Sequence, residues 1–475
     1  MSIRLSRRNI LATTIGIAGG AAAGALTRPA YAATAPLRLT AGTRMLEVNG
    51  KAARVFSLMG PDGKPGLTLA PGERFRTVLA NETDGPTIIH WHGQLPPWTQ
   101  DGFPWPQTPP IEAGATHAYD FAPIPGTFWM HSHQGLQEQT LMTAPLIIRS
   151  AADQREDRQE IVLMLHDFSF RSPEDILAGL TKTATGQGGM AMGGMAMGGG
   201  TAMSGMDLND IDYDAFLAND RTLTDPEVVR MQAPGHVRLR VINGSSASQF
   251  WIDLGALRGT VVAVDGHDVQ PVPVRRVPLA IAQRVDILID LTEQGAFPVL
   301  AQVEGKRARA GIILATPGAA VPRLAAMADA AMPAVDISLE KVLRAKSPLA
   351  GRPADIVHRV VLDGNMSPFA WSMNGEYWPK VTPMMVTPGQ RVEIDMVNHS
   401  MMAHPMHLHG HAFQVVALNG TPVAGAVRDT VLVPAKGSVR IAFDANNPGR
   451  WAFHCHNLYH MMSGMMTEMR YPGIV

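Results

Sequence analysis

Two distant stretches of this chain repeat one pattern of histidines at the same spacing. In both, a Pro-Gly pair stands ten residues before an Asn, and a His-x-His pair starts nine residues after that Asn. Further on, two glycines stand twelve residues apart, and another His pair starts five residues after the second glycine. The four pairs are His90 and His92, His131 and His133, His407 and His409, and His454 and His456. Chance is a poor explanation for four matched spacings, so the chain contains an internal repeat.

A third copy of the scaffold lies between these two and lacks the histidines. Pro234-Gly235 leads to Asn243 at nearly the same spacing, and residues 250–253 read Phe-Trp-Ile-Asp where the first His pair would fall. Short β-branched runs bounded by turn residues occur at 239–242, 261–264 and 285–291. Three such copies predict an all-β protein of three Greek-key β-sandwiches.

We place the three domains at 36–150, 158–317 and 352–475, with 318–351 as a connector. Helical periodicity is expected only at 172–180 and 210–219. The chain has 475 residues, of which 46% are hydrophobic, so it can bury several cores. Its formal net charge is −1 and it has no extended block of like charge, which argues against a nucleic-acid partner.

Residues 1–32 resemble a twin-arginine export signal rather than part of a fold. Arg7-Arg8 precedes a weakly apolar run rich in Ala and Gly, and residues 30–32 form a small-x-small cleavage site. A membrane anchor is the alternative, but the run is too short and too rich in glycine to span a bilayer comfortably. We therefore expect a periplasmic protein that has no membrane attachment once the signal is removed.

Residues 186–206, here called the Met-rich segment, contain nine Gly, six Met and no charge. Such a composition cannot pack a core, so we expect a loop within the second domain. Its thioethers, which suit Cu(I), belong to Met190, Met192, Met195, Met197, Met203 and Met206. The alternative is a flexible Gly linker with incidental methionines.

The His pairs predict metal binding. Residues i and i+2 of a strand point to the same face, so each pair directs two imidazoles at one point. Neutral imidazole binds Cu, Zn, Fe or Ni. One pair alone would more often be structural, whereas four pairs at repeated spacings indicate a metal cluster.

The single cysteine adds a second kind of site. Strand alternation places Cys455 on the face opposite its two histidine neighbours, so the thiolate serves a different metal from theirs. The candidate ligands of this second metal are His404, Cys455, His460 and, as a long axial ligand, Met465. This set matches a blue-copper site, whereas zinc would favour a closed tetrahedron without a thioether. Met462 and Met466 compete with Met465, and an inert buried thiol is the alternative for the cysteine.

These segments resemble those of the multicopper oxidases, the family of laccases, ascorbate oxidase, ceruloplasmin and bacterial cuprous oxidases. The resemblance covers essentially the whole chain after the signal and implies three cupredoxin domains, with a three-copper cluster between the first and the last. It also implies four copper ions. The type 1 copper would bind to His404, Cys455, His460 and Met465, and the type 2 copper to His90 and His407. One type 3 copper would bind to His92, His131 and His456, and the other type 3 copper to His133, His409 and His454.

The expected mechanism is an electron relay. A substrate gives single electrons to the copper held by Cys455, whose neighbours His454 and His456 ligate the cluster, where dioxygen takes four electrons and leaves as water. Asp101 matches an acid that the bacterial family places near the cluster, and it could also be only a turn residue. The position of a second family acid is Met461, so either another acid such as Glu468, or water, takes that role, or turnover is slower.

We expect oxidation of Cu(I) to less toxic Cu(II), in copper tolerance, with laccase-like oxidation of phenols as a second activity. One alternative is a general phenol oxidase in which the Met-rich segment only buffers copper. A second is a non-enzymatic copper-binding relative, and a copper nitrite reductase ranks lower still. The resemblance also implies a monomer, because the three-domain enzymes of this family carry both cluster-bearing domains in one chain.

Overall fold

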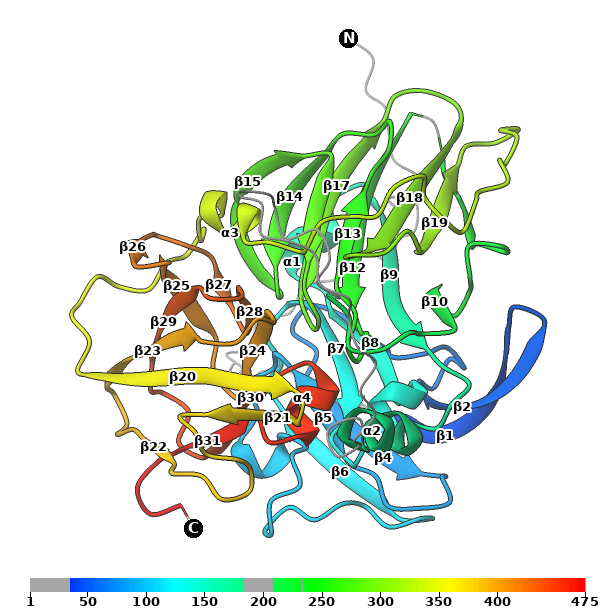
Figure 1. Ribbon diagram of the computed structural model, residues 1–475. Coiled ribbons are helices and arrows are strands. Elements are labelled where there is room, and N and C mark those ends of the chain that lie inside the picture. The colour runs from blue at the N-terminus through cyan, green and yellow to red at the C-terminus, as the bar shows by residue number, and fades with distance from the viewer. Residues whose placement is uncertain (1–34, 183–207, 233, 475) are drawn as a thin grey trace, which may run out of the picture. The chain divides into compact units, whose positions relative to one another are not determined.

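The computed structural model describes residues 35–182, 208–232 and 234–474. The signal at 1–32 and the Met-rich segment lie outside the described residues. From Leu37 to the C-terminus the described chain forms one compact unit. It consists of paired β-sheets, and the predicted all-β class is confirmed (Figure 1).

The first sandwich packs two four-stranded sheets around a core that includes Phe75, Trp91 and Phe128. One sheet has the order β2-β1-β4-β6 and the other β3-β8-β7-β5. Their bounds are β1 Leu37–Val48, β2 Lys51–Met59, β3 Leu67–Leu69, β4 Phe75–Asn81, β5 Ile89–His92, β6 Thr116–Phe121, β7 Gly126–Ser132 and β8 Thr143–Ile148. Alternation of buried and partly buried residues along β4 marks a strand with one face on the core.

The second sandwich has sheets of order β10-β9-β12-β17-β14-β15 and β11-β19-β18-β13-β16. The bounds are β9 Gln159–Phe168, β10 Ala215–Ala218, β11 Val228–Arg230, β12 Gly235–Asn243, β13 Phe250–Asp253, β14 Gly259–Val264, β15 His267–Val274, β16 Arg276–Leu279, β17 Arg284–Leu291, β18 Ala296–Val303 and β19 Arg309–Ala315. The three predicted runs fall in β12, β14 and β17. Strand β13 occupies the place of the missing His pair.

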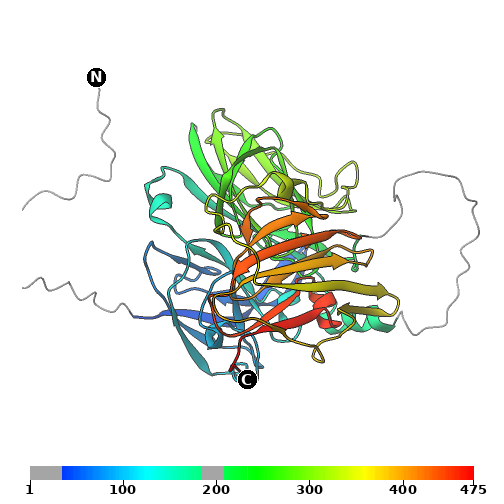
Figure 2. The same ribbon diagram turned by 90° about the vertical axis from the view of Figure 1, so that its left-hand side faces the viewer.

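The third sandwich repeats the plan of the first, and Figure 2 shows its orange and red strands in front. Its sheets have the orders β21-β20-β23-β29-β25-β26, with β27 pairing β25, and β22-β31-β30-β24-β28. The bounds are β20 Ile356–Met366, β21 Phe369–Met373, β22 Met384–Met385, β23 Arg391–Asn398, β24 His404–Leu408, β25 Phe413–Leu418, β26 Thr421–Pro422, β27 Val427–Arg428, β28 Thr430–Val433, β29 Ser438–Asp444, β30 Arg450–Cys455 and β31 Met466–Arg470.

The described helices are short. They are α1 Ala151–Arg155, α2 Pro173–Lys182, α3 Ser338–Val342 and α4 Leu458–Met462, with 3-10 turns η1 Trp98–Gln100 and η2 Gln137–Thr140. The helix predicted at 172–180 is α2. The helix predicted at 210–219 is wrong, because Ala215–Ala218 is buried and pairs with β9 as strand β10. Tertiary pairing outweighs local periodicity there.

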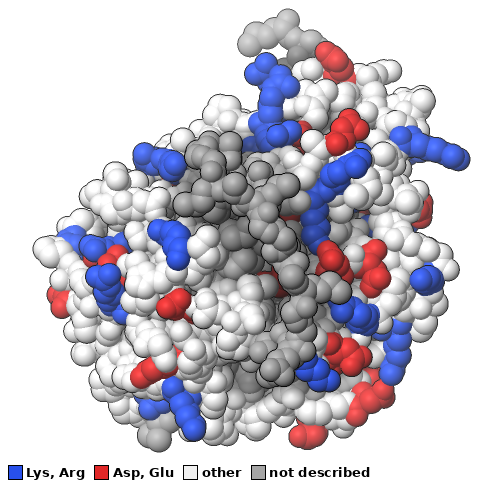
Figure 3. Space-filling view, viewed as in Figure 1, with Lys and Arg blue, Asp and Glu red and all other residues white. Residues whose placement is uncertain are grey.

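Within the described residues, no helix combines the length and the apolar character that crossing a bilayer requires. Lys and Arg are interspersed with Asp and Glu over the described part of the face in Figure 3. This mixture agrees with the absence of a charge block in the sequence.

Candidate metal centres

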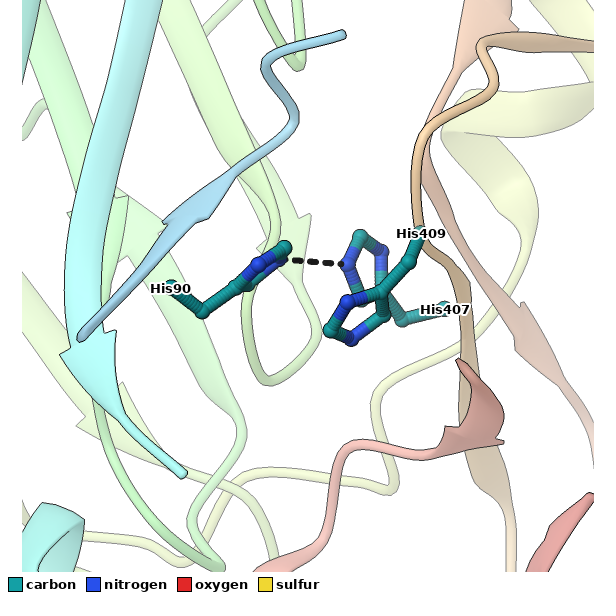
Figure 4. Close-up of side chains that lie close together, drawn as sticks. All are labelled: His90, His407 and His409. Carbon is teal, nitrogen blue, oxygen red and sulfur yellow. Dashed lines mark hydrogen bonds between the residues drawn. The ribbon is translucent and has the colours of Figure 1, made fainter. Parts of the chain in front are cut away.

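The repeated His pairs meet between the first and third sandwiches. Strands β5 and β7 pair so that His90 lies opposite His131, and β24 and β30 pair so that His407 lies opposite His454. The two strand pairs face each other, and the Nε2 atoms of His90 and His407 are 3.4 Å apart (Figure 4). Residues 317 apart in sequence therefore share one site.

Two of the close groups of imidazoles match the type 3 sets that the resemblance implied, and His90 also groups with His407 and His409 and with His131 and His133. Nitrogen atoms within 4.8 Å of one another form the sets His92, His131, His456 and His133, His409, His454. Within the first set, His131 Nε2 lies 3.4 Å from both His92 Nδ1 and His456 Nε2. Within the second, His409 Nε2 lies 3.0 Å from His454 Nε2.

For eight of the imidazoles, the ring nitrogen that points away from the meeting point faces an acceptor or a hydroxyl, whereas His456 Nδ1 has no hydrogen-bond partner. The pairs are His90 Nδ1 with Asp101 O (2.8 Å), His409 Nδ1 with Asp101 Oδ2 (2.7 Å), His407 Nδ1 with Asp429 O (2.8 Å), His92 Nε2 with Asp429 Oδ1 (3.0 Å), His131 Nδ1 with Glu138 Oε2 (2.7 Å), His454 Nδ1 with Cys455 O (3.0 Å), His404 Nε2 with Ser400 Oγ (2.7 Å) and His460 Nε2 with Asp210 Oδ2 (2.9 Å). An outward N–H leaves the inward nitrogen with a lone pair, as metal binding requires.

Burial favours the neutral form of several cluster imidazoles. Desolvation, followed by repulsion from neighbouring imidazoles, holds the pKa of His92, His131 and His407 well below its ordinary value. Burial lowers the pKa of His454 to about 4. Neutral imidazoles can bind a cation without first losing a proton.

The second centre lies around Cys455 in the third sandwich. Cys455 Sγ lies 3.7 Å from His404 Nδ1 and 3.8 Å from His460 Nδ1, and the two nitrogens are 3.2 Å apart. The Cys455 N–H donates to the Met465 carbonyl at 3.1 Å, and both side chains are fully buried in one core. The Trp371 ring stacks on His460 with centroids 4.0 Å apart. Two imidazoles and one thiol converge here, with a thioether residue next to them.

This donor set fits copper. Burial raises the pKa of the Cys455 thiol, so a thiolate there needs a cation to balance its charge. His133 Nε2 is completely buried and has no hydrogen-bond partner, which a metal ion would supply. Sulfur and imidazole ligands together suit copper, and the all-imidazole sets are compatible with it.

Four buried carboxylates border the centres, and the sequence singled out only Asp101. Its side chain is fully buried, and its Oδ1 lies 3.3 Å from His90 Nδ1. The three that sequence reasoning missed are Glu138, Asp210 and Asp429. Only Asp429 is marked in the sequence, because the charged pair Arg428-Asp429 interrupts the apolar run 423–433.

Two other residues have structural roles, and one of them, Glu468, is the acid considered in the sequence as a second proton donor. Glu468 forms ion pairs with Arg450 and Arg470, so its carboxylate is already engaged by two guanidinium groups. His411 is a structural histidine next to His409, and its Nε2 lies 2.7 Å from the Tyr471 hydroxyl. Burial lowers the pKa of His411 to about 4.

Three family models, each described as multicopper oxidase, match residues 44–153, 160–319 and 352–473. A multicopper oxidase of Mycobacterium tuberculosis is 31% identical over 452 residues, covering 94% of this chain and 88% of that protein. Copper resistance protein A of Escherichia coli is 28% identical over 613 residues, covering 99% of this chain and 100% of that protein.

Solved structures show the same fold. The crystal structure of Fet3p, described as a multicopper oxidase that functions in iron import, superposes with a TM-score of 0.76 at 20% identity. That alignment covers 92% of this chain and 90% of Fet3p. At this identity, the likeness shows the three-domain cupredoxin architecture and no more.

Proposed function

This chain belongs to the multicopper oxidase family and is a copper-dependent oxidoreductase, and we propose that it couples one-electron oxidation of Cu(I) to the four-electron reduction of dioxygen to water. The observation that carries the proposal is the pair of centres joined through one tripeptide. Cys455 belongs to the site in the third sandwich, and its neighbours His454 and His456 belong to the two all-imidazole sets.

We assign four coppers to these residues. His404, Cys455, His460 and Met465 would hold a type 1 ion, and His90 and His407 a type 2 ion. His92, His131 and His456 would hold one type 3 ion, and His133, His409 and His454 the other. Bound copper would supply the one-electron chemistry at the first site and the four stored electrons that reduce dioxygen at the cluster. Copper stoichiometry with a visible spectrum and electron paramagnetic resonance tests the assignment.

The residues of the chain prepare this chemistry. The Cys455 backbone connects the two centres, so their separation is fixed by one strand. Asp101 touches the outward nitrogens of His90 and His409, one from each cluster-bearing domain. We propose that its carboxylate holds a proton at Oδ1, the atom without a hydrogen-bond partner, and delivers it to the reduced oxygen.

The substrate proposal rests on what lies at the two ends of the Met-rich segment. Helix α2 precedes it, and Ile176 of α2 shares a core with Trp371, the residue that stacks on His460. Asp210 follows it, and its carboxylate lies 2.9 Å from His460 Nε2. The described residues that flank the segment on both sides therefore lie close to His460, a proposed type 1 ligand.

Deletion of residues 186–206 tests this role. We expect kcat/KM for Cu(I) to fall at least tenfold while kcat/KM for a small phenol changes less than twofold. Replacing the six methionines by leucine keeps the length and removes the sulfur, and should reproduce the loss. An unchanged Cu(I) rate in both variants would exclude the segment from substrate handling.

Phenol oxidation is the second candidate activity. A cavity of about 480 Å³ opens between α2 and α4, and its apolar lining includes Leu136, Leu177, Phe369 and Met462. Phe369 lies 6.0 Å from His460 between ring centroids, so an aromatic substrate could approach the type 1 ligands there. A Phe369→Ser variant should raise KM for the phenol and leave Cu(I) oxidation nearly unchanged.

We also propose export by the twin-arginine route to the periplasm, a role in copper tolerance, and a monomeric state. Replacing Arg7 and Arg8 by lysine should leave the protein in the cytoplasmic fraction with its signal uncleaved. Sedimentation of the copper-loaded protein should give the mass of one chain. A deletion strain should tolerate less copper than its parent.

A further inference from the structure

One side chain of the second sandwich reaches the wall of the histidine cluster. Arg284 begins β17, and its side chain has no exposed surface. Its Nη1 donates to Asp429 Oδ1 at 2.8 Å and to the Ala282 carbonyl at 2.9 Å, while Nε donates to the Thr127 carbonyl at 3.2 Å. Nη2 forms a short ion pair with Asp429 Oδ2. Each guanidinium nitrogen has a partner, so its orientation is fixed.

The carboxylate that Arg284 holds belongs to the third sandwich and touches a ligand of the first. Asp429 Oδ1 lies 3.0 Å from His92 Nε2, and the Asp429 carbonyl accepts from His407 Nδ1 at 2.8 Å. Thr430 Oγ1 donates to Asp429 Oδ1 at 2.8 Å and lies 3.1 Å from His92 Nε2. One dipeptide thus contacts the outward nitrogens of two imidazoles assigned to different coppers.

The backbone beside His92 leaves the ion pair no space to move. A Cβ on Gly93 would come within 2.3 Å of Asp429 Oδ2 and 2.6 Å of Arg284 Nη2. The φ angle of Gly93 is +84°, which also favours glycine. The chain segment that carries His92 is therefore packed directly on the Arg284–Asp429 pair.

The pair belongs to a buried charge network that ties the second sandwich to the third. Asp265 accepts from the Arg284 backbone N–H at 2.8 Å and from Arg428 Nε at 2.9 Å, and Arg428 also pairs with Glu340. All these side chains are at most 5% exposed. A buried charge that loses its partner is costly, so the network holds one geometry.

We propose that Arg284 is a positioning residue for the copper cluster: by fixing the Asp429–Thr430 dipeptide, it sets the orientation of His92 and His407, so the second domain determines cluster geometry without supplying a ligand. The inference rests on the copper assignment proposed above. It differs from a merely structural role, because an inter-domain ion pair would stabilise the fold and leave the metal signatures unchanged.

The chain offers a matched control for the structural role. Arg240 on β12 is also fully buried and joins domains, since its Nη1 donates to Thr127 Oγ1 and to Asp286 Oδ2, both at 2.8 Å. None of its described partners contacts a histidine of the cluster. The two arginines share Thr127, whose carbonyl accepts from Arg284 Nε. Loss of Arg240 nevertheless removes a buried charge without removing a direct contact to Asp429, His92 or His407.

The test compares Arg284→Met, Arg284→Lys and Arg240→Met in the full chain, titrated with copper from the metal-free form. The readouts are copper bound per chain, the type 1 blue band, the type 2 paramagnetic resonance signal, the near-ultraviolet type 3 band and the thermal midpoint. We expect Arg284→Met to keep the blue band and to lower the affinity for cluster copper by about 10- to 100-fold. Arg284→Lys keeps the positive charge but loses the bidentate contact with Asp429, so copper should bind with altered type 2 and type 3 signals.

Arg240→Met should lower the thermal midpoint and leave all three copper signals as in the wild type. The inference is overturned if Arg284→Met or Arg284→Lys binds cluster copper with wild-type affinity and spectra, or if Arg240→Met produces the same cluster loss. If Arg284→Met does not fold, the copper affinity and spectra of Arg284→Lys test the inference. A wild-type chain without four coppers would instead refute the proposed function, so the two failures are distinguishable.

Discussion

Replacing Asp210 by Asn should raise the reduction potential of the type 1 copper. The Asp210 carboxylate is fully buried, and its Oδ2 lies 2.9 Å from His460 Nε2. Asn457 Nδ2 also donates to this oxygen at 2.9 Å. A negative charge beside a ligand stabilises Cu(II) more than Cu(I), so its removal favours the reduced state and raises the potential. Asn keeps the size of the side chain and one acceptor oxygen.

The magnitude follows from the position of the charge. A metal on His460 Nδ1 would lie about 7 Å from the Asp210 carboxylate. This distance is the sum of the Oδ2–Nε2 contact, the width of the imidazole ring and a metal–nitrogen bond of about 2 Å. At an effective dielectric constant of about 20, two unit charges at that distance interact by about 2.4 kcal/mol. This corresponds to about 100 mV for one electron, which is the largest shift that we expect.

Redox titration of the blue absorption band measures this shift directly. The control is Asp212→Asn, because Asp212 is two residues away and its side chain is 95% exposed, so water and salt screen its charge. A potential that stays constant or falls in Asp210→Asn would refute the electrostatic reasoning. An equal rise in the control would show that the shift does not depend on contact with His460.

Three further predictions concern other parts of the molecule. Cys455→Ser should abolish the blue band while the type 2 signal persists in paramagnetic resonance; a persisting blue band would remove the type 1 assignment. Gly102→Ala should cost about 2 kcal/mol or more in unfolding free energy and reduce cluster copper, because its Cβ would lie 1.8 Å from the Ile89 carbonyl oxygen at a φ of +84°. Burial raises the pKa of Glu304 from 4.5 to about 7, so the folded chain retains a proton there that the unfolded chain loses, and stability falls as pH rises through this window. Chemical denaturation between pH 4.5 and 8 should show that the unfolding free energy falls by about 3 kcal/mol in the wild type and not in Glu304→Gln. An equal dependence of unfolding free energy on pH in the two proteins would contradict this prediction.

The histidine pairs could be found in the sequence because strand geometry is local. Residues i and i+2 of a strand lie on the same face, so the relative orientation of the two imidazoles in each His-x-His pair could be predicted without any tertiary contact. The repeat then showed which pairs belong to equivalent strands. The all-β class and the strands of the second domain followed from the same period and from the turn residues around it.

The carboxylates could not be found in this way. Glu138 reaches His131 from a 3-10 turn, and Asp210 reaches a ligand of another domain from an irregular segment. Neither position is marked by a period. The Glu138–His131 contact depends on how a turn packs against β7 within the first sandwich, and the Asp210–His460 contact depends on how the second and third domains pack. The failed helix at 210–219 has the same cause, since pairing with β9 decided the conformation of that segment.

The position of the cluster also affects how the chain unfolds. His90 and His407 are 317 residues apart, and a metal bound to both would close a loop that includes the whole second sandwich. Closing so long a loop is entropically costly in an unfolded chain, so the metal acts as a cross-link that only the docked domains can form. The metal-free chain should therefore melt less cooperatively than the loaded one, and copper should merge separate domain transitions into one.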